Sequence, residues 1–193
     1  MTNTSARAGY LSPLTSPLTE EELNNELQAM VKGITGLPGK MVRPRWQPKP
    51  PKQPEHEVNW CAVGIADEDR QGFAAVLHNS AGDGSDTVIN WETLGALATF
   101  YGPLAWDMAG RLRDGLAIEQ NRAELRKSGL ALGGIGRRVK VPELVNNAWL
   151  QRVDLPLELR NEARRTFGVL NLLDAPVIAK SDDGLTVHTT PMI

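Results

Sequence analysis

The sequence of 193 residues has little of what disulfide-bonded scaffolds, membrane proteins and secreted proteins depend on. Its one cysteine, Cys61, cannot close a disulfide within the chain, so nothing points to an oxidising compartment. The longest run without a charged residue, 93–106, is fourteen residues long and is interrupted by glycine and proline. A bilayer span needs about 20 apolar residues, so we predict no membrane association. Residues 1–17 lack the continuous apolar segment of a secretory signal.

An excess of charge of either sign is missing as well. Lys and Arg number 21 and Asp and Glu number 23, which gives a net charge of −2 and a pI near 5.9. A dedicated nucleic-acid binder needs a basic excess to neutralise phosphates, so we expect no specific nucleic-acid binding. The hydrophobic content of 41% is enough for a core, and the length fits one domain with an arm.

The three histidines do not suggest a metal or catalytic centre. His56, His78 and His188 have no second histidine or cysteine at metal-ligand spacing, so we predict no metal site. His78, Ser80 and Asp83 are the residue types of a hydrolase triad, but they share one glycine-rich loop. We interpret them as polar turn residues.

Two other patterns resemble binding motifs only in part. The acidic run 67–69 offers carboxylates to a divalent cation but lacks the spacing of a calcium loop. The glycine-rich stretch 133–138 lacks the Gly-Lys-Ser/Thr end of a phosphate-binding loop. Arg137, Arg138 and Lys140 form a small basic patch that we interpret as a solvated turn, with nucleic-acid contact as the alternative. The sequence therefore predicts no catalytic residues, no cofactor and no enzyme.

The first strong structural signal is an amphipathic helix over 19–34. Thr19 and Glu22 have the spacing of a capping box, which satisfies the free N–H groups of a helix start. Apolar residues then recur with the helical period: Leu23, Leu27, Met30, Val31 and Ile34. Such a helix must dock on the rest of the protein, whereas residues 1–18 are predicted to form a flexible N-terminal arm.

A basic, proline-rich segment at 42–57 follows the helix. Five of the eleven residues from 44 to 54 are prolines, which excludes a helix and favours an extended chain. Residues 33–54 hold five basic residues and no acidic one. We interpret 42–57 either as an arm or edge strand that reaches a partner, or as a solvated linker. Trp46 among the charges is unusual for a linker.

Alternating apolar residues then predict strands. Residues 60–66 form one, which we expect the acidic run 67–69 to end, with 73–78 as its hairpin partner. Residues 87–101 are rich in β-forming types, and their alternation switches near Thr93, which indicates a bulge or a strand buried on both faces.

The second half mixes helices and strands. Helices are predicted over 103–116 and 119–128, and a strand over 139–141 after a glycine-rich turn at 133–136. Because strands and helices are grouped rather than strictly alternating, we predict an α+β fold.

The last predicted strand is 153–159, which alternates cleanly between apolar and polar residues. Pro156 lies within it and indicates an edge strand or a bulge, since proline cannot donate to a sheet. We expect 165–173 to pair back on this strand across a turn at 161–162.

Taken together, these segments resemble the neck or tail terminator proteins of long-tailed bacteriophages. The stretches that carry the resemblance are, in order, VRPRWQP at 42–48, WCAVGI at 60–65, FYGP at 100–103, Asn121-Arg122 with Leu125 and Gly129, and Trp149 with Arg152 and Asp154. The resemblance covers about residues 19–180 and departs at 2–17 and 181–193.

The resemblance implies one α+β domain at 19–180, with helices on one face of a mostly antiparallel sheet, followed by a C-terminal tail at 181–193. It also implies a structural virion protein, assembled in the host cytoplasm as a homohexameric ring at the head-proximal end of the tail. Such a ring ends tail tube polymerisation and offers the neck a docking surface, with the genome passing through its lumen. Its partners are further copies, tail tube or sheath protein, and neck or connector proteins.

The residues themselves suggest where copies meet. Arg43, Arg45 and Trp46 lie on the basic segment, and Asp67 and Asp69 begin a stretch, 67–92, with six acids against one arginine. We predict these five residues at the interface between copies, because the two segments are charge-complementary. Two alternatives stay open: a head-completion or neck connector protein on the portal side, and a small enzyme whose site the sequence does not reveal.

Overall fold

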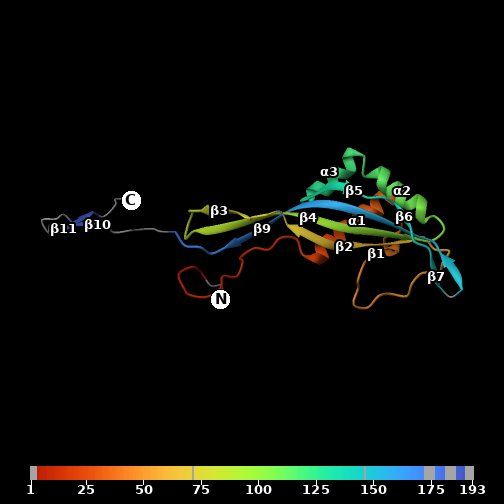
Figure 1. Ribbon diagram of the computed structural model, residues 1–193, viewed down its shortest axis with the longest axis horizontal. Coiled ribbons are helices and arrows are strands. Elements are labelled where there is room, and N and C mark those ends of the chain that lie inside the picture. Colours follow the sequence, from red (N-terminus) through yellow and green to blue (C-terminus); the bar gives the residue numbers. More distant parts are fainter. Residues whose placement is uncertain (1–3, 71, 146, 172–176, 181–185, 190–193) are drawn as a thin grey trace. The chain divides into compact units, whose positions relative to one another are not determined.

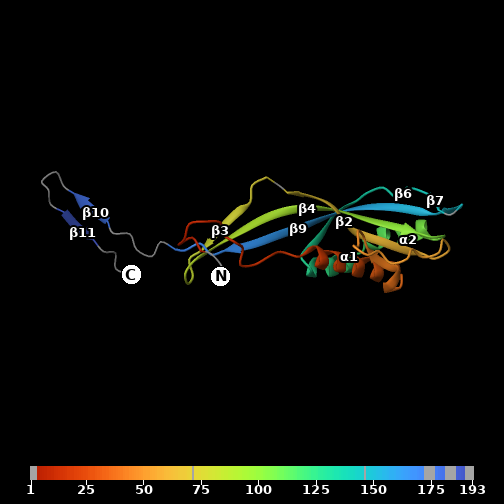
Figure 2. The same cartoon turned by 90° about the horizontal axis from the view of Figure 1, so that it is seen from below.

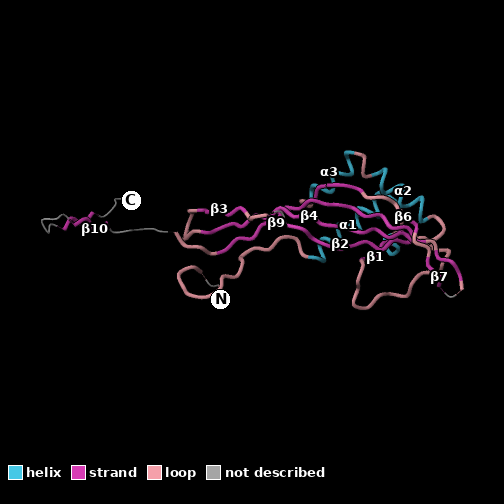
Figure 3. The backbone as a smooth tube through the Cα atoms, viewed as in Figure 1, coloured by secondary structure: helices cyan, strands magenta, loops and turns pink. Residues whose placement is uncertain are grey.

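The computed structural model describes residues 4–70, 72–145, 147–171, 177–180 and 186–189, and Figures 1 and 3 show its elements. Backbone contacts divide the chain into two compact units. The larger unit comprises Ser16–Ala75 and Ile89–Arg164, and the smaller comprises Met1–Thr15, Val76–Val88 and Arg165–Ile193. Within the described ranges no helix has both the length and the apolar character needed to span a membrane.

A mostly antiparallel sheet organises the chain. Its strands are β1 (Val42–Pro44), β2 (Trp60–Arg70), β3 (Ala75–Asn79), β4 (Ser85–Tyr101), β5 (Leu130–Ile135), β6 (Val139–Lys140) and β9 (Arg152–Phe167). The order is β1-β2-β4-β9-β5, with β3 paired to β4 and β6 paired to β9. The β1–β2 pair is parallel, whereas β2–β4, β5–β9 and β6–β9 are antiparallel. Two separate hairpins, β7 (Glu143–Val145) with β8 (Ala148–Leu150) and β10 (Val177–Lys180) with β11 (Thr186–Thr189), complete the strands.

Helices α1 (Glu20–Thr35), α2 (Ala105–Gly115) and α3 (Glu119–Lys127) lie on one face of the sheet in the larger unit, as Figure 2 shows, and a short 3-10 turn, η1 (Gly39–Met41), leads into β1. The predicted α+β class is confirmed. One core joins the layers, and its fully buried members include Leu27, Val31, Cys61, Val63, Ala98, Phe100, Leu112, Leu130, Leu155 and Leu159. Burial of these side chains is the main force that holds helices and sheet together.

Helix α1 forms as its sequence predicts. The Thr19 hydroxyl accepts a hydrogen bond from the Glu22 N–H at 3.3 Å, and the Thr19 N–H donates to the Glu22 carboxylate at 2.7 Å. This capping box supplies partners to N–H groups that the helix start leaves free. Gly36 ends the helix with a φ of 77°, a left-handed conformation that glycine adopts without a steric penalty. The helices predicted at 103–116 and 119–128 are also present, as α2 and α3.

The acidic run does not end β2, so that prediction is wrong. A bulge between Ile65 and Asp67 shifts the register, and the strand continues to Arg70 opposite Glu92 of β4. Residues 66–70 are exposed, and charged side chains on a solvent-facing strand keep their hydration, so they do not interrupt the ladder. Gly95 lies opposite Asp67 and leaves room for its carboxylate, which contacts the place where a Cβ would stand.

The predicted partner of this strand is also wrong, because β3 pairs with β4 instead of β2. The chain reverses after β3 through Gly82 and Gly84, whose φ angles of 61° and 97° suit glycine. This turn brings β3 onto the start of β4, so the glycine-rich loop that holds Ser80 and Asp83 contains the turn of a hairpin.

The strand β9 corrects the predicted turn at 161–162 and the edge-strand alternative for Pro156, whereas the alternative of a bulge agrees with a one-residue shift in register between Ile135↔Leu157 and Val139↔Asp154. It runs unbroken through residues 161 and 162 to Phe167 and lies between β4 and β5, so it is neither an edge strand nor half of a hairpin turning there. Pro156 is tolerated inside the sheet because it faces the place where the partner changes from β5 to β6. Its carbonyl accepts the Gly136 N–H at 2.8 Å.

The glycine-rich turn predicted at 133–136 is mostly strand. Gly133 and Gly134 belong to β5, which has a bulge between Leu132 and Gly134. The Glu158 side chain occupies the space that a Cβ at Gly133 would need, 2.7 Å from its carboxylate oxygen. These glycines therefore permit a close approach of β9.

Candidate subunit interface

Arg43 of the basic segment lies on the face of the sheet opposite the core, which we call the open face, whereas Arg45 and Trp46 also line a cavity with residues of α1. Along β1 and β2, Val42, Cys61 and Val63 point into the core, so Arg43 and its cross-strand neighbour Ala62 point the other way. On β2 and β4, Trp60 and Tyr101 are directly opposite one another and stack with ring centroids 4.2 Å apart.

Two arginines are placed over this aromatic pair and its neighbours. The Arg43 guanidinium lies 5.4 Å from the Trp60 ring centroid, within cation–π range. Arg45 donates a hydrogen bond of 2.6 Å to the hydroxyl of the buried Thr99, and its guanidinium lies 4.9 Å from the Trp46 ring. The first half of the proline-rich segment is therefore anchored on the chain's own sheet and is not a fully solvated linker.

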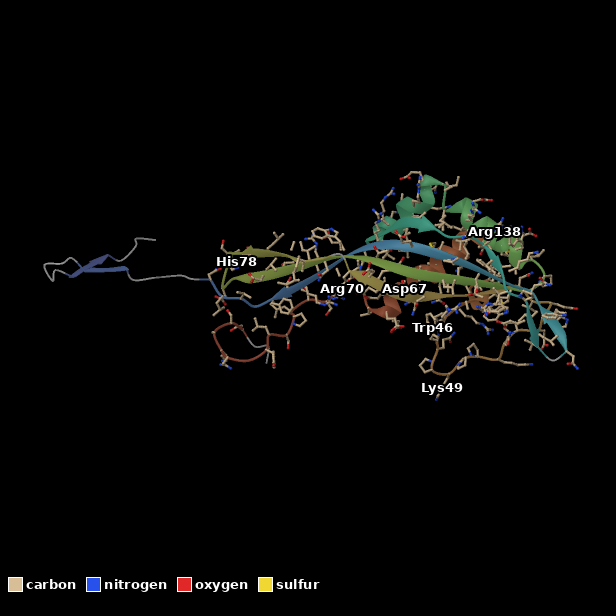
Figure 4. The ribbon with its side chains drawn as sticks, in the orientation of Figure 1. Trp46, Lys49, Asp67, Arg70, His78 and Arg138 are labelled. Atoms are coloured by element: carbon tan, nitrogen blue, oxygen red, sulfur yellow. The ribbon has the colours of Figure 1, made fainter. Side chains whose placement is uncertain are left out.

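Trp46 has an unusual backbone conformation. Its φ of 52° lies in the left-handed region, which costs a non-glycine residue on the order of 1–3 kcal/mol. Its side chain is 63% exposed, so burial of the indole within this chain does not repay that cost. Gln47 braces the turn by donating to the Pro44 carbonyl at 2.9 Å. Figure 4 shows Trp46 near the base of this loop and Lys49 farther out on it.

A cavity of about 400 Å³ lies between the open face and the proline-rich loop. It is lined by Arg43, Pro44, Arg45, Trp46, Gln47, Pro50, Pro51, Gln53, Trp60, Ala62, Tyr101 and Glu143. Two buried donors beside it, Arg45 Nε and Trp60 Nε1, have no hydrogen-bond acceptor among the described atoms. Aromatic rings, guanidinium groups and unpaired donors are the components of a contact surface for a protein chain with carbonyl or carboxylate oxygens.

The acidic stretch divides into a structural part and an exposed part. Arg70 pairs with Glu68 at 2.6 Å and with Glu92 at 3.2 Å. Glu92 is only 6% exposed and also accepts a 3.1 Å hydrogen bond from Asn161. The hydrogen bond and charge of Glu68 raise the pKa of Arg70 above its ordinary value. These groups hold the sheet together.

Asp67 and Asp69 are exposed on β2. Across the described part of the chain, neither carboxylate has an ion pair, and no ion pair links either of them to Arg43 or Arg45. Figure 4 shows Asp67 farther along the sheet than Trp46. The structure thus brings Arg43, Arg45 and Trp46 together and leaves the two aspartates apart from them.

Sequence reasoning missed three residues of the open face: Trp60, Thr99 and Tyr101. Trp60 was assigned to a strand, but its ring partner depends on which residue of β4 lies opposite. One signal in the sequence could have found the pair: Trp60 begins one predicted strand, and Tyr101 ends another. Register, which the sequence does not give, decides that these two ends meet.

Of the triad-like residues, His78 bonds to Asp86 and Asn171 in the smaller unit, not to the side chains of Ser80 and Asp83. His78 Nδ1 lies 2.6 Å from an Asp86 carboxylate oxygen, and Nε2 lies 2.8 Å from the Asn171 side-chain oxygen. The hydrogen bond with Asp86 raises the pKa of His78. Asn171 also donates to the carbonyls of Ser80 and Gly82, so these residues serve the turn. In the part of the chain that is described, no three histidine, cysteine or acidic side chains are grouped to hold a metal.

Exposed tryptophans are frequent on this chain. Of its five tryptophans, Trp46, Trp91, Trp106 and Trp149 are each at least 39% exposed. The Arg138 guanidinium lies 4.1 Å and the Lys140 Nζ 5.1 Å from the Trp106 ring centroid, so two cations of the predicted basic patch stack on this tryptophan. Tryptophan and arginine are enriched at the energetic centres of protein–protein interfaces. The fold and these surfaces define an α+β subunit suited to contacts with other proteins.

The comparison with known families agrees with this class. A family model described as phage neck terminator protein matches residues 21–183. The chain therefore belongs to the phage neck terminator family, a family of structural virion proteins located at the junction of tail and neck. The resemblance drawn from the sequence is confirmed. None of the curated proteins compared with the chain matches it.

Proposed function

We propose that copies of this chain close into a ring at the head-proximal end of the phage tail, where the ring ends tube polymerisation and gives the neck its docking surface. A tube end accepts further rings for as long as each new ring presents the same upper surface. Length control therefore requires a subunit that binds the tube end and presents a different surface on its other side. The family match over 21–183 supports this role, and we take six copies from the resemblance to terminator proteins.

The observation that carries the ring proposal is a pair of unmatched charge sets on one chain. Arg43 and Arg45 lack an acidic partner, and Asp67 and Asp69 lack a basic one, within the described ranges. Head-to-tail contacts join two different surfaces of one subunit and close into rings when the rotation permits. The two arginines of one copy and the two aspartates of the next copy supply such surfaces, with Trp46 beside the arginines as an aromatic anchor.

Charge reversal tests this contact. Arg43→Glu places like charges across the proposed junction, and so does Asp67→Arg, whereas the double variant R43E/D67R restores opposite charges with exchanged sides. We expect each single variant to give tails of abnormal length and unjoined heads, and the double variant to recover joined tails. Arg137→Glu is the matched control, because Arg137 is exposed and unpaired in the described structure and lies outside the proposed contact.

Electron microscopy of particles from infections with each variant provides the readout. Joined tails of normal length from both single variants contradict the proposed contact. Omitting the protein altogether separates the two structural roles. Free tails of abnormal length support a terminator, whereas free tails of normal length favour a connector on the portal side. In either role the genome passes the protein without being held, so we expect no tight duplex binding near 150 mM salt, about physiological ionic strength.

A further inference from the structure

The hairpin β7–β8 presents two apolar side chains to solvent. Leu144 and Trp149 are directly opposite in its register and are 61% and 64% exposed. Side chains in directly opposite positions share one face of a hairpin, so together they form a single apolar surface, which we call the hairpin face. Leu150 is buried. The hairpin therefore places its largest apolar side chain, Trp149, away from the chain's own core.

The base of this hairpin is held firmly. Arg152 donates to Glu143 at the start of β7 and makes two hydrogen bonds to Asp154, at 2.9 and 3.0 Å. A two-stranded hairpin has marginal stability in water by itself, and this ion-pair network adds to the stability of β7–β8. A solvent-exposed tryptophan on a braced hairpin has the composition and placement of an interface anchor.

A second unpartnered apolar surface lies on the helix layer. A cavity of about 340 Å³ between α1 and α3 is lined by the apolar side chains of Met30, Ile34 and Leu125. Its polar lining residues include Glu26 and Glu124. We call it the α1–α3 groove. Its volume is at the lower end of the roughly 300–1,000 Å³ of ligand pockets, which is room for about one large side chain.

Gly33 lines this groove within α1. A glycine in a helix interior costs about 1 kcal/mol relative to alanine. Nothing lies within 4 Å of the place where a Cβ at Gly33 would stand, so no described residue of this chain requires the glycine. A close approach by another chain at this point would explain why the helix has a glycine here.

We propose that the α1–α3 groove of one copy receives the hairpin face of a second copy, with the Trp149 indole as the inserted side chain. Figure 1 shows β7 at one extremity of the larger unit and α3 well away from it, so the same chain does not fill its own groove. A projecting face at one place and a matching groove at another give a head-to-tail contact, the kind that closes into rings. This inference rests on the proposed self-assembly and names a second contact within it.

The contact is one part of a junction. An aromatic side chain buries roughly 150–250 Å², whereas a standard interface buries about 800 Å² per partner. The groove contact therefore acts together with the contact of Arg43 and Arg45 with the aspartates. Loss of Trp149 weakens association by about tenfold or more, as expected for an aromatic anchor, without abolishing it.

Disulfide trapping in assembled tails tests the contact. The double variant G33C/L144C places one thiol in the groove and one on the hairpin face beside the retained Trp149, and the native Cys61 is fully buried. After mild oxidation, we expect a ladder of covalent multimers on a denaturing gel without reductant. The control G33C/W106C keeps the groove thiol and moves the second thiol to an exposed apolar position outside the hairpin face, so it is expected to stay monomeric.

Purified single variants provide a second test that does not depend on cysteine geometry. Trp149→Ala lacks the hairpin face, and Gly33→Leu fills the groove from an open position. Each alone is expected to self-associate about tenfold more weakly, and mixing them restores one full-strength junction, which gives dimers above the level of either variant alone. Trp91→Ala is the matched control for loss of an exposed tryptophan.

Monomeric G33C/L144C in normally assembled tails overturns the groove contact, as do unchanged affinities of both single variants. Either result leaves the ring proposal standing if the charge-reversal variants still disrupt tails. Normal joined tails in the absence of the protein overturn the ring proposal itself.

Discussion

Truncation of Leu27 to alanine tests whether α1 is seated on the sheet as described. Leu27 is fully buried in the common core, and α1 contacts β1, β2, α2 and α3. Leu27→Ala removes three carbon atoms from this interior and leaves a cavity that the strands and helices around it cannot fully close. Comparable leucine truncations cost about 2.7–5 kcal/mol, depending on how far the site collapses. The rigid sheet beneath the helix argues for a value near the middle, about 3–4 kcal/mol.

Equilibrium unfolding in urea and thermal melting measure this loss. For a chain of this length, each kcal/mol corresponds to about 2–4 °C, so the melting temperature should fall by roughly 6–16 °C. Leu23→Ala should lose less, about 1 kcal/mol, because Leu23 is only partly buried against the same core. Asn25→Ala on the exposed side of the helix is the control and should stay within about 0.5 kcal/mol of the parent protein.

An Leu27→Ala loss no larger than that of Asn25→Ala would refute the docking of α1. The functional counterpart is L23D/L27D, which places two carboxylates where apolar contacts stood and should unseat the helix at a cost of several kcal/mol, on the order of 3–5. Because the α1–α3 groove and the helix layer depend on α1, phage with this variant should yield free tails of abnormal length.

Two further predictions concern local contacts. Thr19→Ala removes the capping box of α1 and should lower the free energy of unfolding by about 1 kcal/mol in urea titration, whereas an unchanged midpoint would show that the box does not matter. His78 faces acceptors at both ring nitrogens, which suits the imidazolium, so its contact with Asp86 stabilises the turn fully below the ordinary pKa of 6.5 and loses this effect as pH rises through the raised value. NMR titration should show a pKa above 6.5 that falls in Asp86→Asn; a value at or below 6.5 in the parent protein contradicts this reasoning.

Elements with local signals could be predicted from the sequence. The capping box, the helical period of apolar residues and the terminal glycine all act within one helix, and they place α1 within a residue of its observed bounds. The helices that became α2 and α3 were found from the same kind of pattern. The buried alternation of β9 was also found, because Val153, Leu155, Leu157 and Leu159 face the core from one strand.

Features that depend on a partner strand could not be predicted. Asn161 is a turn-forming type in isolation, yet it lies inside β9, where it donates to the buried Glu92 of β4. The same holds for the open face, where Trp60 and Tyr101 become a stacked pair only in one register. Arg43, Arg45 and Trp46 could be singled out because basic residues and a tryptophan among prolines are visible in the sequence.

The acids between residues 67 and 92 show why composition alone does not locate an interface. Glu92 is buried and paired with Arg70, Asp86 pairs with His78, and Asp67 lies exposed over Gly95. Because Glu92 and Asp86 are already paired within the fold, a cation of a neighbouring copy would gain little by approaching them. An unpaired carboxylate on an exposed strand keeps its full charge for an incoming guanidinium. The interface prediction therefore rests on Asp67 and Asp69 rather than on the acidity of the whole stretch. Glu68, Glu92 and Asp86 already pair with residues of the same chain and stabilise its fold.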